Sequence, residues 1–74
     1  MDRTRSLDHV ETALRAHRKE LERFVAARVS VADADDILQI AAMRAIENAD
    51  RLADPEKVLP WLYQIHRTVA VDVV

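Results

Sequence analysis

The chain has 74 residues, a formal net charge of −2, and neither cysteine nor glycine. One domain of this size buries only about 60% of its unfolded surface, and the missing cysteine and glycine exclude disulfides, thiolate metal sites, catalytic thiols and glycine-rich phosphate loops. No apolar run approaches the roughly 18 residues of a membrane span, and the N-terminus lacks the apolar core of a signal peptide, so we expect a cytoplasmic protein without membrane insertion.

The first predicted helix runs from about Asp8 to Arg28 and begins at a capping box, because Asp8 and Glu11 have its spacing. Apolar and aromatic side chains recur along one face at helical spacing, and this face is expected to pack in the core. Its residues are Val10, Ala13, Leu14, His17, Leu21, Phe24 and Val25. The opposite, solvated side holds Arg15, Lys19, Glu22 and Arg23.

The second predicted helix runs from about Ala34 to Ala49, with Asp33 as its N-cap and Asp36 at the third position. At about 100° per residue, one side of this helix is apolar throughout and is expected to be core. That side consists of Ile37, Leu38, Ala41, Ala42, Ala45 and Ala49.

The other side of the second helix has the pattern of a docking face. Gln39, Ile40, Met43 and Glu47 all lie within about 60° of Asp36 on the helical wheel, opposite the core side. Spacing of i, i+3, i+4 and i+7 is typical of helix anchors against a partner, and two of these residues are apolar although they are predicted to lie outside. The alternative is that they are scattered surface hydrophobics, which are common.

Acidic residues dominate the middle of the chain. Residues 31–56 carry seven acidic and two basic residues, a net charge of −5, whereas residues 1–30 carry +2 and residues 57–74 carry +1. Such a segment repels a nucleic-acid backbone and suits a basic protein partner.

The dense carboxylates Asp33, Asp35 and Asp36 suggest a metal site, an acid/base pair, a helix cap or a docking face. A calcium loop needs ligands spread over about twelve residues and a central glycine, and this cluster has neither. The three histidines are far apart without the spacing of a zinc motif, and no Ser-His-Asp arrangement has positional support. We therefore expect no metal, no cofactor and no enzymatic activity.

The third predicted helix begins near Asp54, after the one long connection, residues 48–57. Pro60 removes a hydrogen-bond donor, so the helix is either kinked there or starts only at Pro60. Its core stripe is Val58, Leu62, Ile65 and Val69, flanked by Trp61 and His66.

Four residues of the third helix are predicted to point away from the core: Tyr63, Gln64, Arg67 and Thr68. An aromatic ring, an amide and a guanidinium on one exposed face can stack on bases and form hydrogen bonds with them. The alternative is an ordinary polar face. The chain stops within this helical pattern, on VAVDVV, and we expect a domain of a longer protein.

Two separated motifs resemble region 2 of the extracytoplasmic-function (ECF) sigma factors of the sigma-70 family. They are DADDILQ followed by MRAIEN, and, after a loop, WLYQIHRTVAVD. The family pattern is roughly D-A-E-D-L-V-Q, then an F-L-R-A-W-type stretch, then W-L-Y-R-I-A-R-N-x-A-I-D, and the resemblance covers about residues 20–74. It implies an all-α domain over residues 1–74, a compact bundle of three main helices, that acts in transcription initiation.

The resemblance implies that the DADDILQ helix docks on the clamp helices of the RNA polymerase β′ subunit, with Asp36 and Gln39 at the family's contact positions. An anti-sigma factor that covers this face would silence the protein. The predicted docking residues for polymerase and anti-sigma factor are Asp33, Asp35, Asp36, Gln39, Ile40, Met43 and Glu47.

The resemblance also implies a role for the loop and the last helix in opening the promoter −10 element and holding a flipped base of the non-template strand. The predicted DNA-binding residues are Asn48, Arg51, Leu52, Trp61, Tyr63, Gln64, Arg67 and Thr68.

Three residues depart from the family pattern: Ile40 replaces a glutamate, Leu52 an aromatic residue, and Thr68 an asparagine. The first makes the docking face more apolar, and the others put base stacking and base specificity in question. The helix-turn-helix domain that reads the −35 element is missing, so we expect that this chain alone does not initiate transcription. The alternative function is a helical adaptor or antitoxin-like module without direct DNA contact.

Overall fold

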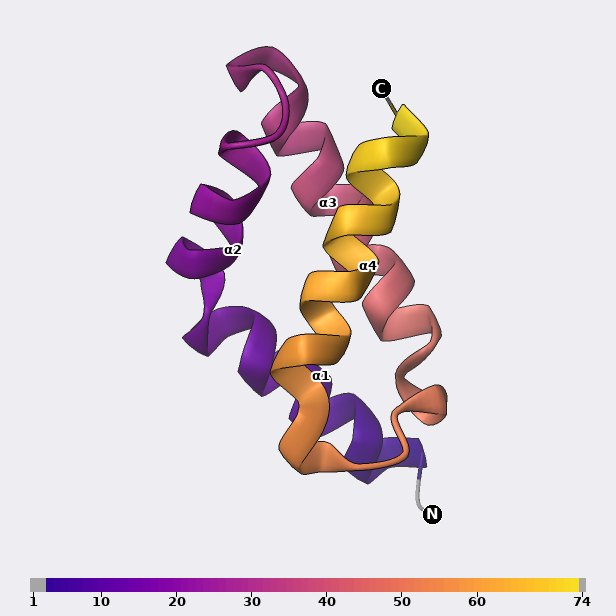
Figure 1. The fold of residues 1–74 in the computed structure, drawn as a ribbon. Helices are drawn as coiled ribbons and strands as arrows, with labels where there is room; N and C mark the ends of the chain where they lie inside the picture. Colours follow the sequence, from indigo (N-terminus) through magenta and orange to yellow (C-terminus); the bar gives the residue numbers. More distant parts are fainter. Residues whose placement is uncertain (1–2, 74) are drawn as a thin grey trace.

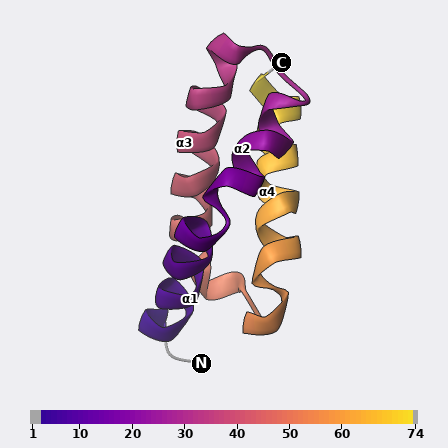
Figure 2. The same cartoon turned by 90° about the vertical axis from the view of Figure 1, so that its left-hand side faces the viewer.

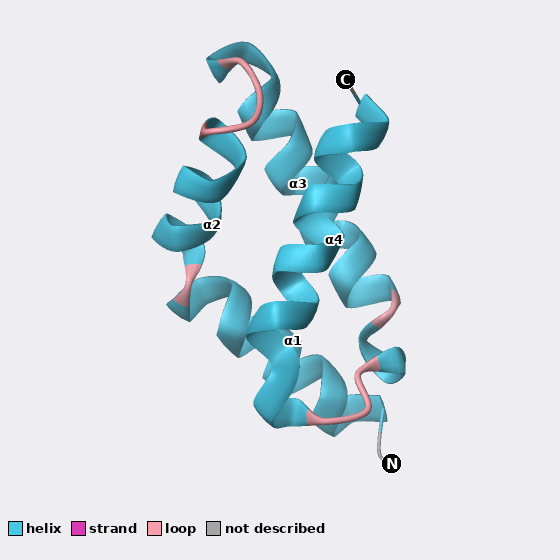
Figure 3. Cartoon of the chain, viewed as in Figure 1, coloured by secondary structure: helices cyan, strands magenta, loops and turns pink. Residues whose placement is uncertain are grey.

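The computed structural model describes residues 3–73, and within them every regular element is helical (Figure 3). Two short 3₁₀ turns connect the last two α-helices. The elements in order are α1 (Arg3–Ala16), α2 (Arg18–Ala26), α3 (Val31–Glu47), η1 (Ala49–Arg51), η2 (Pro55–Lys57) and α4 (Val58–Val73). This confirms the predicted all-α class; residues 1–2 and 74 lie outside the described part.

The helices form a bundle in which α1 and α2 follow one another along one side (Figures 1 and 2). The helices α3 and α4 run in opposite directions beside each other, and the connection with η1 and η2 crosses the end of the bundle at which α1 begins. None of the helices in the described residues combines the length and apolar character needed to cross a bilayer.

The predicted single helix from Asp8 to Arg28 is wrong, because the chain bends at His17. The backbone of His17 has φ −111° and ψ 20°, which ends α1 and starts α2. Asp8 lies within α1 rather than at its start, so the predicted capping box is absent. The bend lets Val10 of α1 and Val25 of α2 pack into different clusters of the core.

The N-cap of α3 is Ser30, not Asp33 as predicted. The Asp33 amide donates to Ser30 Oγ at 3.3 Å, and that hydroxyl donates to Asp33 Oδ2 at 3.0 Å. Serine followed three residues later by an acidic residue is a variant of the capping box. Because Ser30 caps the helix by accepting from the Asp33 amide, α3 begins at Val31, three residues before the predicted start.

The start of α4 differs from both predicted alternatives. Asp54 caps η2 by accepting a hydrogen bond from the Glu56 amide at 3.0 Å, and α4 follows directly at Val58. Pro60 therefore lies in the first helical turn. The amides of that turn have no partner within the helix, so the donor that proline lacks is not needed there.

The core consists of two clusters, and the apolar faces predicted for all three helical segments line them. The first is built from Val10, Ala13, Leu21, Ala45, Ala49, Leu52 and Leu62. The second is built from Val25, Ile37, Ala41, Val69 and Ala70. The buried residues that α3 contributes are Ala45 in the first cluster and Ile37 and Ala41 in the second.

His66 is fully buried, with 1% of its surface exposed, rather than flanking the core as predicted. Its Nδ1 donates a hydrogen bond of 2.7 Å to the Leu62 carbonyl. Burial lowers the pKa of the imidazole because the charged form loses its hydration, and the hydrogen bond opposes this shift in part.

Candidate functional site

Four of the five residues of the predicted docking face lie on the outside of α3, and the docking role itself stays a prediction. Asp36, Gln39, Met43 and Glu47 are exposed, with 60% of Met43 open to solvent. In the described part of the chain, no hydrogen bond or ion pair engages the side chains of these residues. They are free to bind a partner.

Ile40, in contrast, is half-buried and packs against the second core cluster, so the prediction that it lies outside is wrong. It lies on the side of α3 that turns toward α4, and Val69 of that cluster comes from α4. Its place as an outward apolar residue is taken by Ile46, which is 41% exposed and lies three residues after Met43. An i, i+3 search around Met43 would have found Ile46 in the sequence.

The two other predicted docking acids have different surroundings. The Asp33 carboxylate accepts the Ser30 hydroxyl at the start of α3, where a negative charge favours the helix end. Asp35 is exposed and lines a hollow between α3 and the first two helices. Within the described residues, no three His, Asp or Glu side chains converge as metal ligands would.

This α2–α3 hollow has a volume of about 510 Å³. Its lining combines four aliphatic side chains with four charged residues of both signs and two polar ones. The lining residues are Leu14, Arg15, Arg18, Leu21, Glu22, Asp35, Leu38, Gln39, Ala42 and His66. Because Asp35 and Gln39 belong to it, the hollow borders the outward face of α3.

A second hollow, the α3–α4 hollow, is lined by residues from the end of α3, the turn η1 and residues 61–68 of α4. Its volume is about 320 Å³, at the lower end of the range of small-molecule sites, about 300–1,000 Å³. It is lined by Arg44, Asn48, Arg51, Trp61, Gln64, Ile65 and Thr68. Five of these seven are among the predicted DNA-binding residues, so the fold brings together residues from the loop and the last helix.

The polar groups of the α3–α4 hollow are partly fixed by the backbone. Asn48 Nδ2 donates to the Arg44 carbonyl at 2.8 Å, which caps α3 and holds the amide in place. Thr68 Oγ1 donates to the Gln64 carbonyl at 2.9 Å, so the hydroxyl presents only acceptor lone pairs to a ligand. Among the described residues, the lining contains two guanidinium groups and an indole ring but no carboxylate. This combination suits an aromatic, hydrogen-bonding and anionic ligand, the chemistry of a nucleotide.

Leu52 was predicted to contact DNA, and the structure corrects this. Its side chain is 2% exposed and lies in the first core cluster. The leucine follows η1 and anchors the connection between α3 and α4 on the core. A DNA base cannot contact the Leu52 side chain while it is buried in the core.

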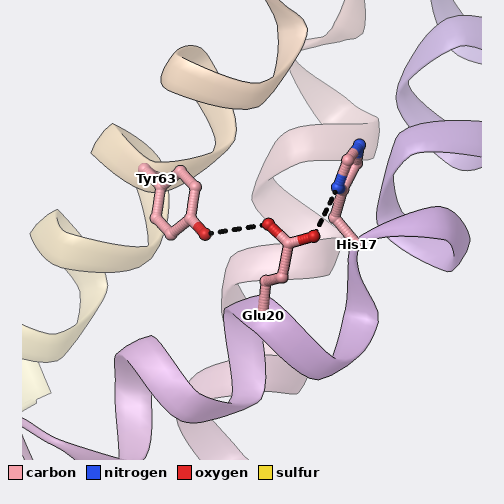
Figure 4. Close-up of polar contacts among 3 residues, drawn as sticks. All are labelled: His17, Glu20 and Tyr63. Atoms are coloured by element: carbon pink, nitrogen blue, oxygen red, sulfur yellow. Dashed lines mark hydrogen bonds and ion pairs between the residues drawn. The ribbon is translucent and has the colours of Figure 1, made fainter.

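Tyr63 faces α2 and lies outside the α3–α4 hollow, so it does not share a face with Gln64 as predicted. Its ring meets the Phe24 ring edge-on, with centroids 4.8 Å apart and an interplanar angle of 70°. Its hydroxyl points at Glu20 Oε2 at 3.5 Å, and Glu20 Oε1 accepts from His17 Nδ1 at 3.1 Å (Figure 4). Tyr63 and Gln64 are consecutive in α4 and therefore point about 100° apart.

Arg67 is exposed but does not line the hollow either, whereas Arg44 does, and the sequence prediction missed it. Arg44 precedes Asn48 by one helical turn, which places both on the side of α3 that faces α4. This spacing could have indicated Arg44. Its Nη1 lies 3.6 Å from Asp72 Oδ2 at the end of α4.

A comparison with protein-family models matches residues 13–74 to Sigma-70 region 2. The matched span includes the whole outward face of α3 and every residue of the α3–α4 hollow. Comparisons with curated proteins and with solved structures gave no match.

Proposed function

Because the chain belongs to the sigma-70 region 2 family, whose members act in transcription initiation, we propose that it binds RNA polymerase and the promoter −10 element as part of an ECF sigma factor. The motifs DADDILQ and WLYQIHRTVAVD support the ECF group. The sequence also resembles the sigma factor of cobalt and nickel resistance, and we propose no metal signal for this chain.

The outward face of α3 is the proposed contact with the clamp helices of the polymerase β′ subunit. It combines the acids Asp36 and Glu47 with Gln39 and the exposed apolar pair of Met43 and Ile46. Acidic residues around an apolar centre suit a basic partner helix. The acidic side chains attract the partner's positive charges during association, and the apolar side chains are buried in the interface.

One observation supports the DNA-binding role most strongly. Five residues that lie apart in the sequence and were predicted from the family pattern line one hollow. We propose that this α3–α4 hollow holds one unpaired base of the non-template strand. The indole of Trp61 offers a surface for stacking, and the amides of Asn48 and Gln64 offer hydrogen bonds. The acceptor lone pairs of Thr68 favour a base that presents an amino group.

The two proposed contacts can be made at the same time. Gln39 on the docking face and Arg44 in the hollow are five residues apart in α3, so their side chains point about 140° apart. Polymerase can therefore hold α3 from one side while the DNA strand occupies the other. The proposed role is binding rather than catalysis, in the cytoplasm where polymerase works.

We also propose that an anti-sigma factor silences the protein by covering the docking face. The apolar centre that such an inhibitor would bury is Met43 and Ile46, because Ile40 is engaged in the core. Arg or Lys residues of the inhibitor would meet the surrounding acids.

The DNA-binding role is tested by fluorescence anisotropy with a labelled single strand of the non-template −10 sequence. Trp61→Ala should weaken binding by about 1–3 kcal/mol, the contribution of one base stacked on an aromatic ring. Arg67→Ala is the matched control for Arg51→Ala, because it removes the same charge from outside the hollow. We expect Arg51→Ala to weaken binding more than Arg67→Ala.

Equal binding by all these variants would mean that the α3–α4 hollow holds no base. A wild-type chain that binds polymerase but no single strand would favour the alternative, a helical protein–protein adaptor without DNA contact.

A further inference from the structure

Arg44 lies between the α3–α4 hollow and a competing carboxylate. Its guanidinium lines the hollow, and its Nη1 is also 3.6 Å from Asp72 Oδ2, a residue outside the lining. The two side chains are 47% and 57% exposed, so water reaches both. The Arg44 guanidinium can therefore interact either with a ligand in the hollow or with the Asp72 carboxylate.

The ion pair between Arg44 and Asp72 is weak enough to be replaced. Its distance exceeds the length of a charge-assisted hydrogen bond, about 2.7–2.9 Å, and exposed pairs of this kind contribute little to stability. A phosphate group is a better ligand for the same guanidinium, because arginine binds its oxygens with two parallel hydrogen bonds.

The proposed ligand of the hollow, a base of a DNA strand, carries a backbone phosphate with it. A base stacked at Trp61 belongs to a nucleotide whose backbone stays outside, at the rim. Arg44 and Arg51 are the cations that the described residues contribute to the lining, and none of the described lining residues carries a carboxylate that opposes them. Among the described residues, the carboxylate that pairs with Arg44 is that of Asp72.

We propose that Arg44 binds a backbone phosphate of the single strand held in the α3–α4 hollow, and that Asp72 competes with this phosphate for the guanidinium. Asp72 thereby lowers the affinity for DNA until a correctly placed strand displaces it. This inference rests on the proposed DNA-binding function and adds to it a phosphate ligand and an internal competitor.

The test measures single-strand binding by anisotropy over a range of salt concentrations. Arg44→Gln should lower the affinity and reduce the slope of log K against log salt by about 0.7, the value for one phosphate contact on a single strand. Asp72→Asn should raise the affinity about two- to five-fold, as expected for release of an exposed ion pair.

The double variant separates competition from a general charge effect. If Asp72 acts through Arg44, Asp72→Asn has no effect in the Arg44→Gln background, and the two changes are strongly non-additive. An equal gain from Asp72→Asn in both backgrounds would overturn the proposal, because it would reflect only reduced repulsion of the DNA.

A probe with single neutral methylphosphonate linkages gives a second measurement on the wild-type chain. Neutralising the contacted phosphate should weaken wild-type binding and abolish the difference between wild type and Arg44→Gln. If no single linkage has this effect, Arg44 contacts no defined phosphate and the proposal fails.

Failure of this inference differs from failure of the proposed function. Loss of binding in Trp61→Ala together with unchanged salt slopes in Arg44→Gln would overturn only the role of Arg44. Absence of single-strand binding by the wild-type chain would overturn both. Circular dichroism of each variant checks that the helices remain folded.

Discussion

Leu52→Ala should destabilise the domain rather than remove a DNA contact. Leu52 is 2% exposed in the connection between η1 and η2 and packs in a core cluster with Val10 and Leu62. Transfer of a fully buried leucine side chain from the core to water costs about 1.5–3 kcal/mol, and the cavity left behind raises the usual loss to about 2–5 kcal/mol. Native proteins are stable by only about 5–15 kcal/mol, and small domains are marginal, so we expect a large downward shift of the unfolding midpoint.

The assay is urea unfolding followed by far-ultraviolet circular dichroism. The control is Val31→Ala, which removes methyl groups from an exposed residue of α3 and should change the free energy of unfolding by less than about 0.5 kcal/mol. An unfolding midpoint for Leu52→Ala equal to that of the control, together with weaker DNA binding, would refute the placement of Leu52 in the core.

Three further predictions concern the docking face and the buried histidine. Asp36→Arg or Gln39→Ala should weaken polymerase binding in a pull-down while the melting temperature stays nearly unchanged, since exposed substitutions usually cost under about 0.5 kcal/mol; unfolding of either variant would place these residues in the core. Replacing Met43 and Ile46 together with Asp should abolish binding of polymerase and of the inhibitor; retained inhibitor binding would show that the inhibitor uses another surface. Because burial lowers the pKa of His66 in the folded state, the unfolded state binds its proton first, and the free energy of unfolding should fall as pH drops below about 6.5. Urea unfolding of wild type and of His66→Leu between pH 7.5 and pH 5 measures this, and an equal pH dependence in both would contradict it.

The sequence predicts the core faces well because they follow from periodicity alone. The apolar sides of α3 and α4 recur at helical spacing, and the residues on them, such as Ile37, Ala41 and Val69, are buried. The sequence also contains the signal for the cap at Ser30, a serine three residues before an acidic residue. The cluster of carboxylates at residues 33–36 nevertheless suggested Asp33 as the N-cap, so the predicted start of the helix is three residues too late.

Other features depend on contacts between segments and have no local signal. The bend at His17 occurs without glycine or proline, and after it α2 contributes Leu21 to the first core cluster and Val25 to the second. Ile40 lies at the edge of the outward face, and only the position of α4 decides that it packs inward. The contacts of Tyr63 with Phe24 and Glu20 join residues about forty positions apart, which periodicity cannot reveal.

In the candidate site, too, some residues have a signal in the sequence and others depend on contacts between segments. The family pattern indicated five residues of the α3–α4 hollow from their types and order. It assigned Leu52 to the DNA because that position usually carries an aromatic residue, whereas a leucine in this loop is drawn into the core. Arg44 was missed because it lies on a helix that the pattern associates with polymerase, although its side chain faces α4.

The most direct test of the DNA-binding account uses the intrinsic fluorescence of Trp61, which is the only tryptophan in the chain. Adding a non-template −10 single strand to the wild-type protein should quench this fluorescence and shift its maximum, with the same midpoint as the anisotropy of a labelled strand, because the proposed base stacks on the indole. A strand of the same length that lacks the flipped base should bind more weakly and leave the fluorescence unchanged. Binding seen by anisotropy without any change at Trp61 would contradict the claim that the α3–α4 hollow holds the base.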